Sequence, residues 1–326
     1  CGQYRDAGQN PPTVLAKANQ ALATLDGIVK RFPASRDIGE VHFRRGELLF
    51  SAKRYMDAQE AYQAVITRGA GGSTFYEQSL YKHGWSLFKQ AQNEESLKSF
   101  SQVLDLKLLD RRTAGATRSF ESLSRADREL AEDTLRVMSI AFSYMDGARS
   151  VDELLAGRGS VPYAWLLYSR LGDLYVEKQR YQDAAGTYRA FVARDPVDEH
   201  APSLSNQAIQ AYEKGGFSEL VVVGKTEYVT SYGFGKPFWS GRERSGFPQV
   251  VGELKSNLKD LAQHHHAVAQ KSKKLEDYTV AARWYGEYLN SFPDDPDSAE
   301  TNYMLAEVLF ESRQYANAAR EYERSA

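Results

Sequence analysis

The chain has 326 residues, of which 42% are hydrophobic, and its 41 basic and 43 acidic residues give a formal net charge of −2. This composition supplies enough apolar material for a sizeable core, and the near-neutral charge argues against a general nucleic-acid-binding protein, which usually carries a basic excess. The chain contains no run of about 18 apolar residues, so no transmembrane helix is predicted. It does not begin with a basic segment followed by an apolar one, so no signal peptide is predicted.

The only cysteine is Cys1, so no internal disulfide can form and cysteine usage does not indicate the compartment. Two interpretations of Cys1 stand. It is either the lipidated first residue of a mature bacterial lipoprotein or the point at which a longer chain was cut. We favour the second, because a repeat pattern is already in progress there. We expect association with a membrane only through a lipid anchor or a partner.

Pairs of small residues recur at a fixed interval along the chain. In each pair, the small side chain lets a second helix approach closely, and a large aromatic residue four positions further on fills the remaining space. The interval is twelve residues in three places: Gly46 to Ala58, Gly84 to Ser96, and Gly172 to Ala184. This regularity predicts helical hairpins that stack as about seven structural repeats.

The repeats are expected to be interrupted twice. Residues 107–129 are polar and aperiodic, which indicates a long connection, and residues 234–248 hold several glycines, two prolines and aromatic residues, which indicates an inserted loop. Residues 219–233 contain three consecutive valines that would suit a strand, although their place predicts a second helix. The expected division is repeats over 1–108, a polar connection over 109–130, repeats over 131–228, a loop over 229–249, and repeats over 250–326.

The last expected repeat, from Ser298, has no polar capping helix after it. A solenoid end that exposes an apolar face tends to aggregate, so we expect the natural chain to continue beyond Ala326.

One segment carries the tetratricopeptide repeat (TPR) pattern almost complete. Its residues are Tyr168, Leu171, Gly172, Tyr175, Ala184, Tyr188 and Pro196. Two further segments, which begin with FPAS at 32–35 and with FPDDPDSAETNYMLAEVLF at 292–310, resemble the TPR proteins of the Gram-negative envelope. Examples are the Tol-Pal-associated coordinator of peptidoglycan synthesis and the outer-membrane-assembly lipoprotein BamD, and large bacterial periplasmic TPR proteins are more similar still.

The resemblance implies an all-α fold, a right-handed solenoid of TPR-like helical hairpins with irregular insertions between repeats. It also implies a periplasmic, outer-membrane-associated location and a non-catalytic scaffold or adaptor role in an envelope complex, with envelope proteins as partners and no cofactor. The alternative is a peptidoglycan- or glycan-associated module, in which Tyr81, Trp85 and Trp239 stack on sugar rings.

The first helix of each repeat lines the inner groove of such a solenoid. Counted from the small residue, the second and third residues before it and the first, fourth and fifth after it share one helical face. The predicted partner-binding groove comprises Phe43, Arg44, Phe50, Tyr81, Lys82, Trp85, Phe88, Arg136 and Arg170. Its cations would pair the carboxylates of an extended peptide, its aromatics would pack side chains, and Trp85 is the expected anchor. Alternatively, the cations are solvated and the aromatics pack between neighbouring first helices.

Three further segments resemble functional sites. Phe234, Phe238 and Trp239 would form a second contact surface on the loop, or fold back over neighbouring helices, which we favour slightly. The consecutive His264, His265 and His266 point about 100° apart on a helix, so no metal site is predicted. Glu219 stands where a phosphate-binding loop ending in Gly224-Lys225-Thr226 needs glycine, and no catalytic constellation is apparent.

Overall fold

The structure, a computed structural model, describes residues 11–109, 118, 120–159 and 161–325. These residues contain fifteen α-helices and three short 3-10 turns, with no strand among them. The expected all-α fold of helical hairpins is therefore confirmed. The chain forms two compact units, Cys1–Arg170 (unit 1) and Leu171–Ala326 (unit 2). Cys1 lies outside the described residues, and the five-part division proposed above stays a prediction.

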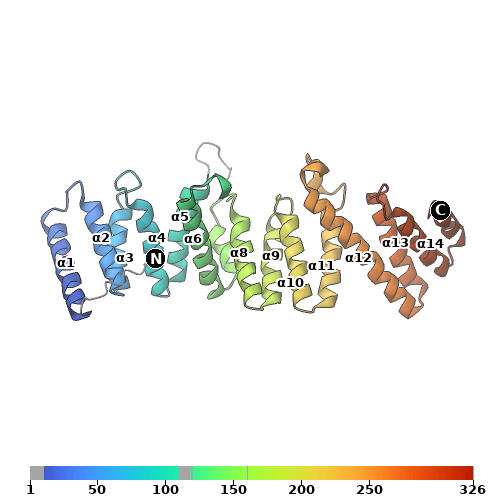
Figure 1. The fold of residues 1–326 in the computed structure, drawn as a ribbon, viewed down its shortest axis with the longest axis horizontal. Helices are drawn as coiled ribbons and strands as arrows, with labels where there is room; N and C mark the ends of the chain where they lie inside the picture. The colour runs from blue at the N-terminus through green and yellow to red at the C-terminus, as the bar shows by residue number, and fades with distance from the viewer. Residues whose placement is uncertain (1–10, 110–117, 119, 160, 326) are drawn as a thin grey trace. The chain divides into compact units, whose positions relative to one another are not determined.

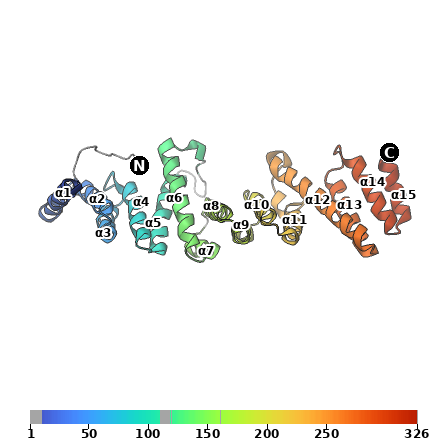
Figure 2. The same ribbon diagram turned by 60° about the horizontal axis from the view of Figure 1, so that its bottom comes forward.

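Unit 1 is a series of antiparallel helices in chain order, in which α2 pairs with α3 and α4 with α5. The two hairpins lie side by side in Figure 1 and in Figure 2. Its helices are α1 (Pro11–Arg31), α2 (Ile38–Ser51), α3 (Tyr55–Ile66), α4 (Tyr76–Lys89), α5 (Asn93–Leu108), α6 (Arg125–Ser143) and α7 (Ala148–Leu155), and the division between the units falls within α8 (Ala164–Glu177).

Unit 2 continues the pattern, and its most closely paired helices are α12 with α13 and α14 with α15. The helices are α9 (Tyr181–Arg194), α10 (Ala201–Lys214), α11 (Ser218–Tyr232), α12 (Pro248–Ser272), α13 (Leu275–Ser291), α14 (Ser298–Glu311) and α15 (Tyr315–Ser325). The two short turns η2 (Pro237–Trp239) and η3 (Arg244–Gly246) lie between α11 and α12. The three consecutive valines belong to a helix, as their place in the repeat predicts.

A small residue on the first helix of a hairpin faces an aromatic ring from the second. A Cβ placed on Gly172 would lie 2.3 Å from Cε1 of Tyr188, and one on Gly46 would lie 2.6 Å from Cε1 of Tyr62. These separations are shorter than any normal contact, so the absence of a side chain is what lets the two helices reach their spacing. The regular interval in the sequence therefore reflects this contact.

The same aromatic residue is tied to the first helix by a hydrogen bond. The hydroxyl of Tyr62 donates to Glu47 at 2.6 Å, and that of Tyr188 donates to Asp173 at 2.8 Å. Each acid follows the small residue directly, and Tyr322 makes the equivalent bond to Glu307. Burial raises the pKa of Tyr62 and Tyr188 above its ordinary value, so both hydroxyls stay protonated and act as donors.

Two of the expected non-helical segments contain helical residues at their ends. Helix α6 begins at Arg125, before residue 131, because the Ser124 hydroxyl accepts the Asp127 backbone N–H at 3.1 Å and caps the helix. The inserted loop is shorter than 229–249, because α11 continues to Tyr232 and α12 begins at Pro248, where proline suits the first turn of a helix.

Replacing Gly172 with alanine tests the close contact. Gly172→Ala should lower the free energy of unfolding by about 1–3 kcal/mol, because the new methyl group must displace Tyr188. Gly186→Ala on α9 is the matched control, since its Cβ would meet nothing within 4 Å. It should be neutral or stabilising by up to about 1 kcal/mol. Urea unfolding followed by circular dichroism measures both, and equal effects would contradict the packing argument.

His83 provides a prediction about pH. It is buried on α4 with Nδ1 2.9 Å from the Ser99 hydroxyl, and burial lowers the pKa of His83 to about 4. The unfolded chain takes up this proton near pH 6.5. Stability from this group is therefore complete above about pH 6.5 and falls as the pH drops toward 4, by about 2 kcal/mol at pH 5.

Urea unfolding at pH 7.5 and pH 5 should show a larger loss for the wild-type chain than for His83→Gln, which cannot titrate there. The same loss in both proteins would mean that His83 is accessible to protons in the folded state.

Candidate functional site

The predicted groove residues of unit 1 lie on the first helices of successive hairpins, α2, α4 and α6, except Arg170, which lies on α8. Phe43 does not belong to an open face. It is 8% exposed, and its ring stacks on Phe75 with centroids 4.6 Å apart and lies 6.1 Å from Tyr62. Its assignment to the groove was wrong, because Phe43 fills the space between the first hairpin and the next.

The predicted row of free cations is largely paired within the chain. Arg44 lies 3.3 Å from Glu40, and the Lys82 ammonium lies 3.3 Å from Glu47. The Arg136 Nε donates to Asp133 at 3.0 Å.

These pairs are partly or largely exposed, and exposed ion pairs contribute about 0–1 kcal/mol, so carboxylates of a partner could replace the partners within the chain. Arg170 is exposed at the end of unit 1. Two of the cations also cover aromatic rings: Arg44 lies 5.6 Å from the Phe75 centroid, and Lys82 lies 5.1 Å from that of Phe50.

Aromatic side chains form a continuous strip from α4 to the end of α6. The Trp85 and Phe88 rings are 5.6 Å apart and perpendicular, and Phe88 stacks on Tyr144 at 6.3 Å. Tyr144 is 67% exposed, and the Lys89 ammonium lies 5.6 Å from the Trp85 ring centroid. We call Trp85, Phe88, Lys89 and Tyr144 the aromatic strip.

Tyr81 packs against this strip and is hydrogen-bonded to α6. Its ring lies 6.4 Å from that of Trp85, and its hydroxyl donates to Asp133 on α6. Burial, together with the hydrogen bond to Asp133, raises the pKa of Tyr81 to about 12, so the hydroxyl remains a donor. The bond joins α4 to α6, which holds the two helices that carry the strip in place.

Trp85 occupies a position that holds an acid in other hairpins. It follows Gly84 directly, as Glu47 follows Gly46, and the facing aromatic of its hairpin is Phe100, which has no hydroxyl to bind an acid. Trp85 instead packs edge-on against Phe100, with centroids 6.3 Å apart. The hairpin of α4 and α5 therefore lacks the tyrosine–acid hydrogen bond and carries an indole at the position of the acid.

The aromatics of the loop between α11 and α12 fold back onto unit 2. Phe238 is fully buried between the rings of Tyr232 and Phe247, and Arg242 lies 4.6 Å from the Phe238 ring centroid. The Trp239 indole donates to the Tyr232 carbonyl at 2.7 Å.

Phe234 packs 5.4 Å from Phe292, beneath Arg244. Phe234, Phe238 and Trp239 therefore form an internal cluster. Phe238 is too deeply buried to form part of a contact surface, whereas Phe234 and Trp239 remain partly exposed, and their role as a contact surface stays a prediction.

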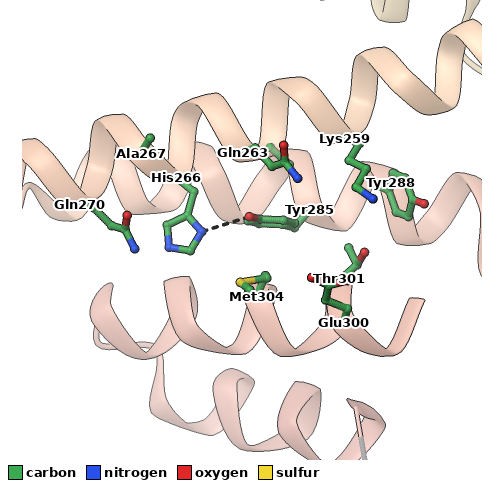
Figure 3. A pocket seen from close by; sticks show the side chains of 11 residues that line it. Lys259, Gln263, His266, Ala267, Gln270, Tyr285, Tyr288, Glu300, Thr301 and Met304 are labelled. Atoms are coloured by element: carbon green, nitrogen blue, oxygen red, sulfur yellow. Dashed lines mark hydrogen bonds between the residues drawn. The ribbon is translucent and has the colours of Figure 1, made fainter. Parts of the chain in front are cut away.

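A cleft in unit 2 was missed by the sequence analysis. It has a volume of about 280 Å³ and lies between α12 and α14, with α13 behind it. Figure 3 shows His266, Tyr285 and Met304 around its centre, and the His266 Nδ1 is 3.0 Å from the Tyr285 hydroxyl. Its lining is Lys259, Ala262, Gln263, His266, Ala267, Gln270, Tyr285, Tyr288, Glu300, Thr301 and Met304.

The repeat interval held the signal for this cleft. Ala269 is buried and stands twelve residues before Ala281, so it is the small residue of this hairpin. The groove positions counted from Ala269 include His266, Ala267 and Gln270, all of which line the cleft. The three histidines separate as expected: His266 faces the cleft, His265 stacks on Trp284 and His264 is exposed.

The family follows from comparison with sequence models. A tetratricopeptide repeat model matches residues 15–73, 143–199 and 273–326, more than half of the chain, and a second tetratricopeptide repeat model matches residues 78–106. The chain belongs to the tetratricopeptide repeat family. Proteins of this family generally mediate protein–protein interactions and use the fold as a non-catalytic binding module. No curated protein matches the chain.

Several solved structures resemble the chain. The C-terminal part of a TPR protein from Cytophaga hutchinsonii is 11% identical, covers 87% of this chain and 94% of that one, and has a TM-score of 0.33. A TPR protein from Parabacteroides merdae is 12% identical, with 92% and 94% coverage and a TM-score of 0.32. The apo quorum sensor NprR from B. thuringiensis is 12% identical, with 96% and 83% coverage and a TM-score of 0.32. Such low scores carry no argument about function.

The part of the chain that the structure describes holds neither a candidate membrane-spanning helix nor a candidate metal-binding cluster, as its helix lengths, hydropathy and side-chain positions show. None of its helices has both the length and the apolar character needed to cross a membrane. It also contains no group of three or more histidine, cysteine or acidic residues placed to hold a metal ion.

The different roles of Phe43 and Tyr144 can be measured. Phe43→Ala should cost about 3–5 kcal/mol of stability, because it opens a cavity in the core. Tyr144→Ala should change stability by less than about 0.5 kcal/mol, because its ring lies on the surface. Urea unfolding of the two variants checks both values, and a large loss for Tyr144→Ala would show that the strip is part of the core.

Proposed function

We propose that the chain is a non-catalytic scaffold or adaptor of a bacterial cell-envelope complex and binds extended segments of partner proteins along the aromatic strip. The observation that carries the proposal is the aromatic row of Trp85, Phe88 and Tyr144, in which the first two rings are partly buried and Tyr144 is exposed, with the exposed Lys89 beside it. Aromatic residues and nearby cations are the groups that contribute most to protein interfaces. Membership of the tetratricopeptide repeat family supports a protein as the ligand.

The hairpin geometry supports binding by the strip. Each ring of the strip rests on another ring or on the core, so little side-chain freedom would be lost when a partner binds. Lys89 and the paired Lys82, both on α4, offer positive charge to acidic residues of a partner. An extended, partly acidic segment fits this face best.

The envelope location rests on sequence resemblance alone. The segments at 32–35 and 292–310 are similar to those of periplasmic TPR proteins, and on this basis we propose a periplasmic location with outer-membrane association through a lipid anchor or a partner. Fractionation of cells that express the native protein tests the location, and recovery of the protein in the cytosol alone would refute it.

A crosslinking pull-down from envelope extract tests the interaction. Three proteins should be compared: the wild-type chain, Tyr144→Ala/Lys89→Glu, and the control Met56→Ala. Met56 is 66% exposed on the second helix α3, away from the strip. We expect a partner that the wild type and the control capture and that the double variant captures at least about tenfold less, as for the loss of an interface hot spot.

Circular dichroism should show that the double variant remains helical. Equal capture by all three proteins would contradict binding at the strip. Sedimentation of the chain with purified cell-wall sacculi would favour the peptidoglycan alternative.

A further inference from the structure

We propose that the cleft between α12 and α14 binds the guanidinium group of an arginine side chain from a partner protein. The site lies in unit 2 and shares no residue with the aromatic strip. It rests on the proposed function only in taking a protein as the ligand.

The size of the cleft suits one long side chain. Its volume of about 280 Å³ is at the lower end of the range of small-molecule pockets, roughly 300–1,000 Å³. Tyr285 and Tyr288 are buried, with 6% and 1% of their surface exposed, so they form a fixed wall of the cleft on α13. Met304 and Ala267 supply apolar surface on the opposite sides of the opening, against which the aliphatic stem of an arginine can pack.

The charge around the cleft favours a cation. The lining itself carries Lys259 and Glu300. Three further carboxylates act on residues of the lining, and one further ammonium group pairs with one of them: Asp295, Asp297, Glu307 and Lys255. Lys259 is neutralised by Asp297 at 3.0 Å, and Lys255 is paired with Asp295. The surplus of negative charge therefore falls on the two remaining glutamates.

Glu300 is the carboxylate that remains available at the cleft. It is exposed, lines the cleft, and makes no hydrogen bond or ion pair among the residues that the structure describes. Burial and then the charge of Glu300 raise the pKa of Tyr285 to about 12, so the Tyr285 hydroxyl stays protonated and uncharged at neutral pH. The charge of Glu300 already acts on the Lys259 ammonium, but a cation in the cleft would add a direct hydrogen-bonded contact to this carboxylate.

His266 does not oppose a cation at neutral pH. Burial lowers the pKa of His266, although the nearby charge of Glu307 acts in the other direction. The ring is therefore neutral at pH 7, and its Nδ1 is engaged with the Tyr285 hydroxyl at 3.0 Å. The imidazole contributes a flat, uncharged surface beside the cleft.

These surfaces distinguish arginine from lysine. A guanidinium group is planar, so it can bind a carboxylate through two parallel hydrogen bonds and stack on an aromatic ring at the same time. Glu300 offers the carboxylate, and the partly exposed imidazole of His266 offers the ring. An ammonium group would use only the charge.

A peptide titration of the full chain tests the proposal. The probe is acetyl-Gly-Ser-Arg-Ser-Gly-amide, and three matched peptides carry citrulline, lysine or aspartate in place of arginine. The readout is NMR of the chain labelled with ¹³C in its histidine rings, with the His266 signal assigned from His266→Gln. We expect the arginine peptide to shift this signal and to bind at least about tenfold more tightly than the citrulline peptide, which has the same shape without the charge.

Matched variants locate the charge. Glu300→Gln should weaken the arginine peptide to the level of the citrulline peptide. Glu311→Gln, an exposed change on the same helix outside the cleft, should leave binding unchanged. Equal binding of arginine and citrulline, tighter binding of aspartate, binding of lysine as tight as arginine, or equal effects of the two glutamine variants would each overturn the proposal.

Failure of this titration is distinguishable from failure of the proposed function. Partner capture through Tyr144 and Lys89 depends on unit 1, and Glu300→Gln should not affect it.

Discussion

The structure depends on one contact, the close approach of a small residue on a first helix to an aromatic ring on the second. At Gly46 and Gly172 the ring lies where a side chain would have to be, and the tyrosine hydroxyl then reaches the acid that follows the glycine. A single position thus sets both the spacing of the helices and their rotation. The same geometry places the neighbouring positions of each first helix on one face, which is where both candidate binding sites occur.

Local departures from this contact create the candidate sites. In the hairpin of α4 and α5, Phe100 replaces the tyrosine, and Trp85 occupies the position of the acid and extends the row of rings that ends at the exposed Tyr144. In unit 2, the long helix α12 and the next first helix, α14, leave a cleft in front of Tyr285. A regular repeat provides the frame, and differences between repeats provide the surfaces with which partners could be distinguished.

The sequence predicted the helical hairpins because their spacing depends on local, periodic contacts such as Gly46 with Tyr62. It predicted the first helices that carry the aromatic strip, but it predicted neither the cleft of unit 2 nor which of the groove residues are free. Phe43 and Phe238 are buried by segments distant in sequence or by a fold-back of the loop, and Arg44 and Lys82 are paired with acids one turn away or on the preceding first helix. Such outcomes depend on tertiary neighbours, which periodicity alone does not specify.

Site-specific photocrosslinking in living cells tests the central claim most directly. A photoreactive phenylalanine analogue should be placed at Tyr144, in the aromatic strip, and separately at Met56, which is equally exposed on the second helix α3. Our account predicts that a defined protein is crosslinked from position 144 and not from position 56. Crosslinking from both positions alike, or from position 56 alone, would contradict the assignment of the aromatic strip as the partner-binding surface.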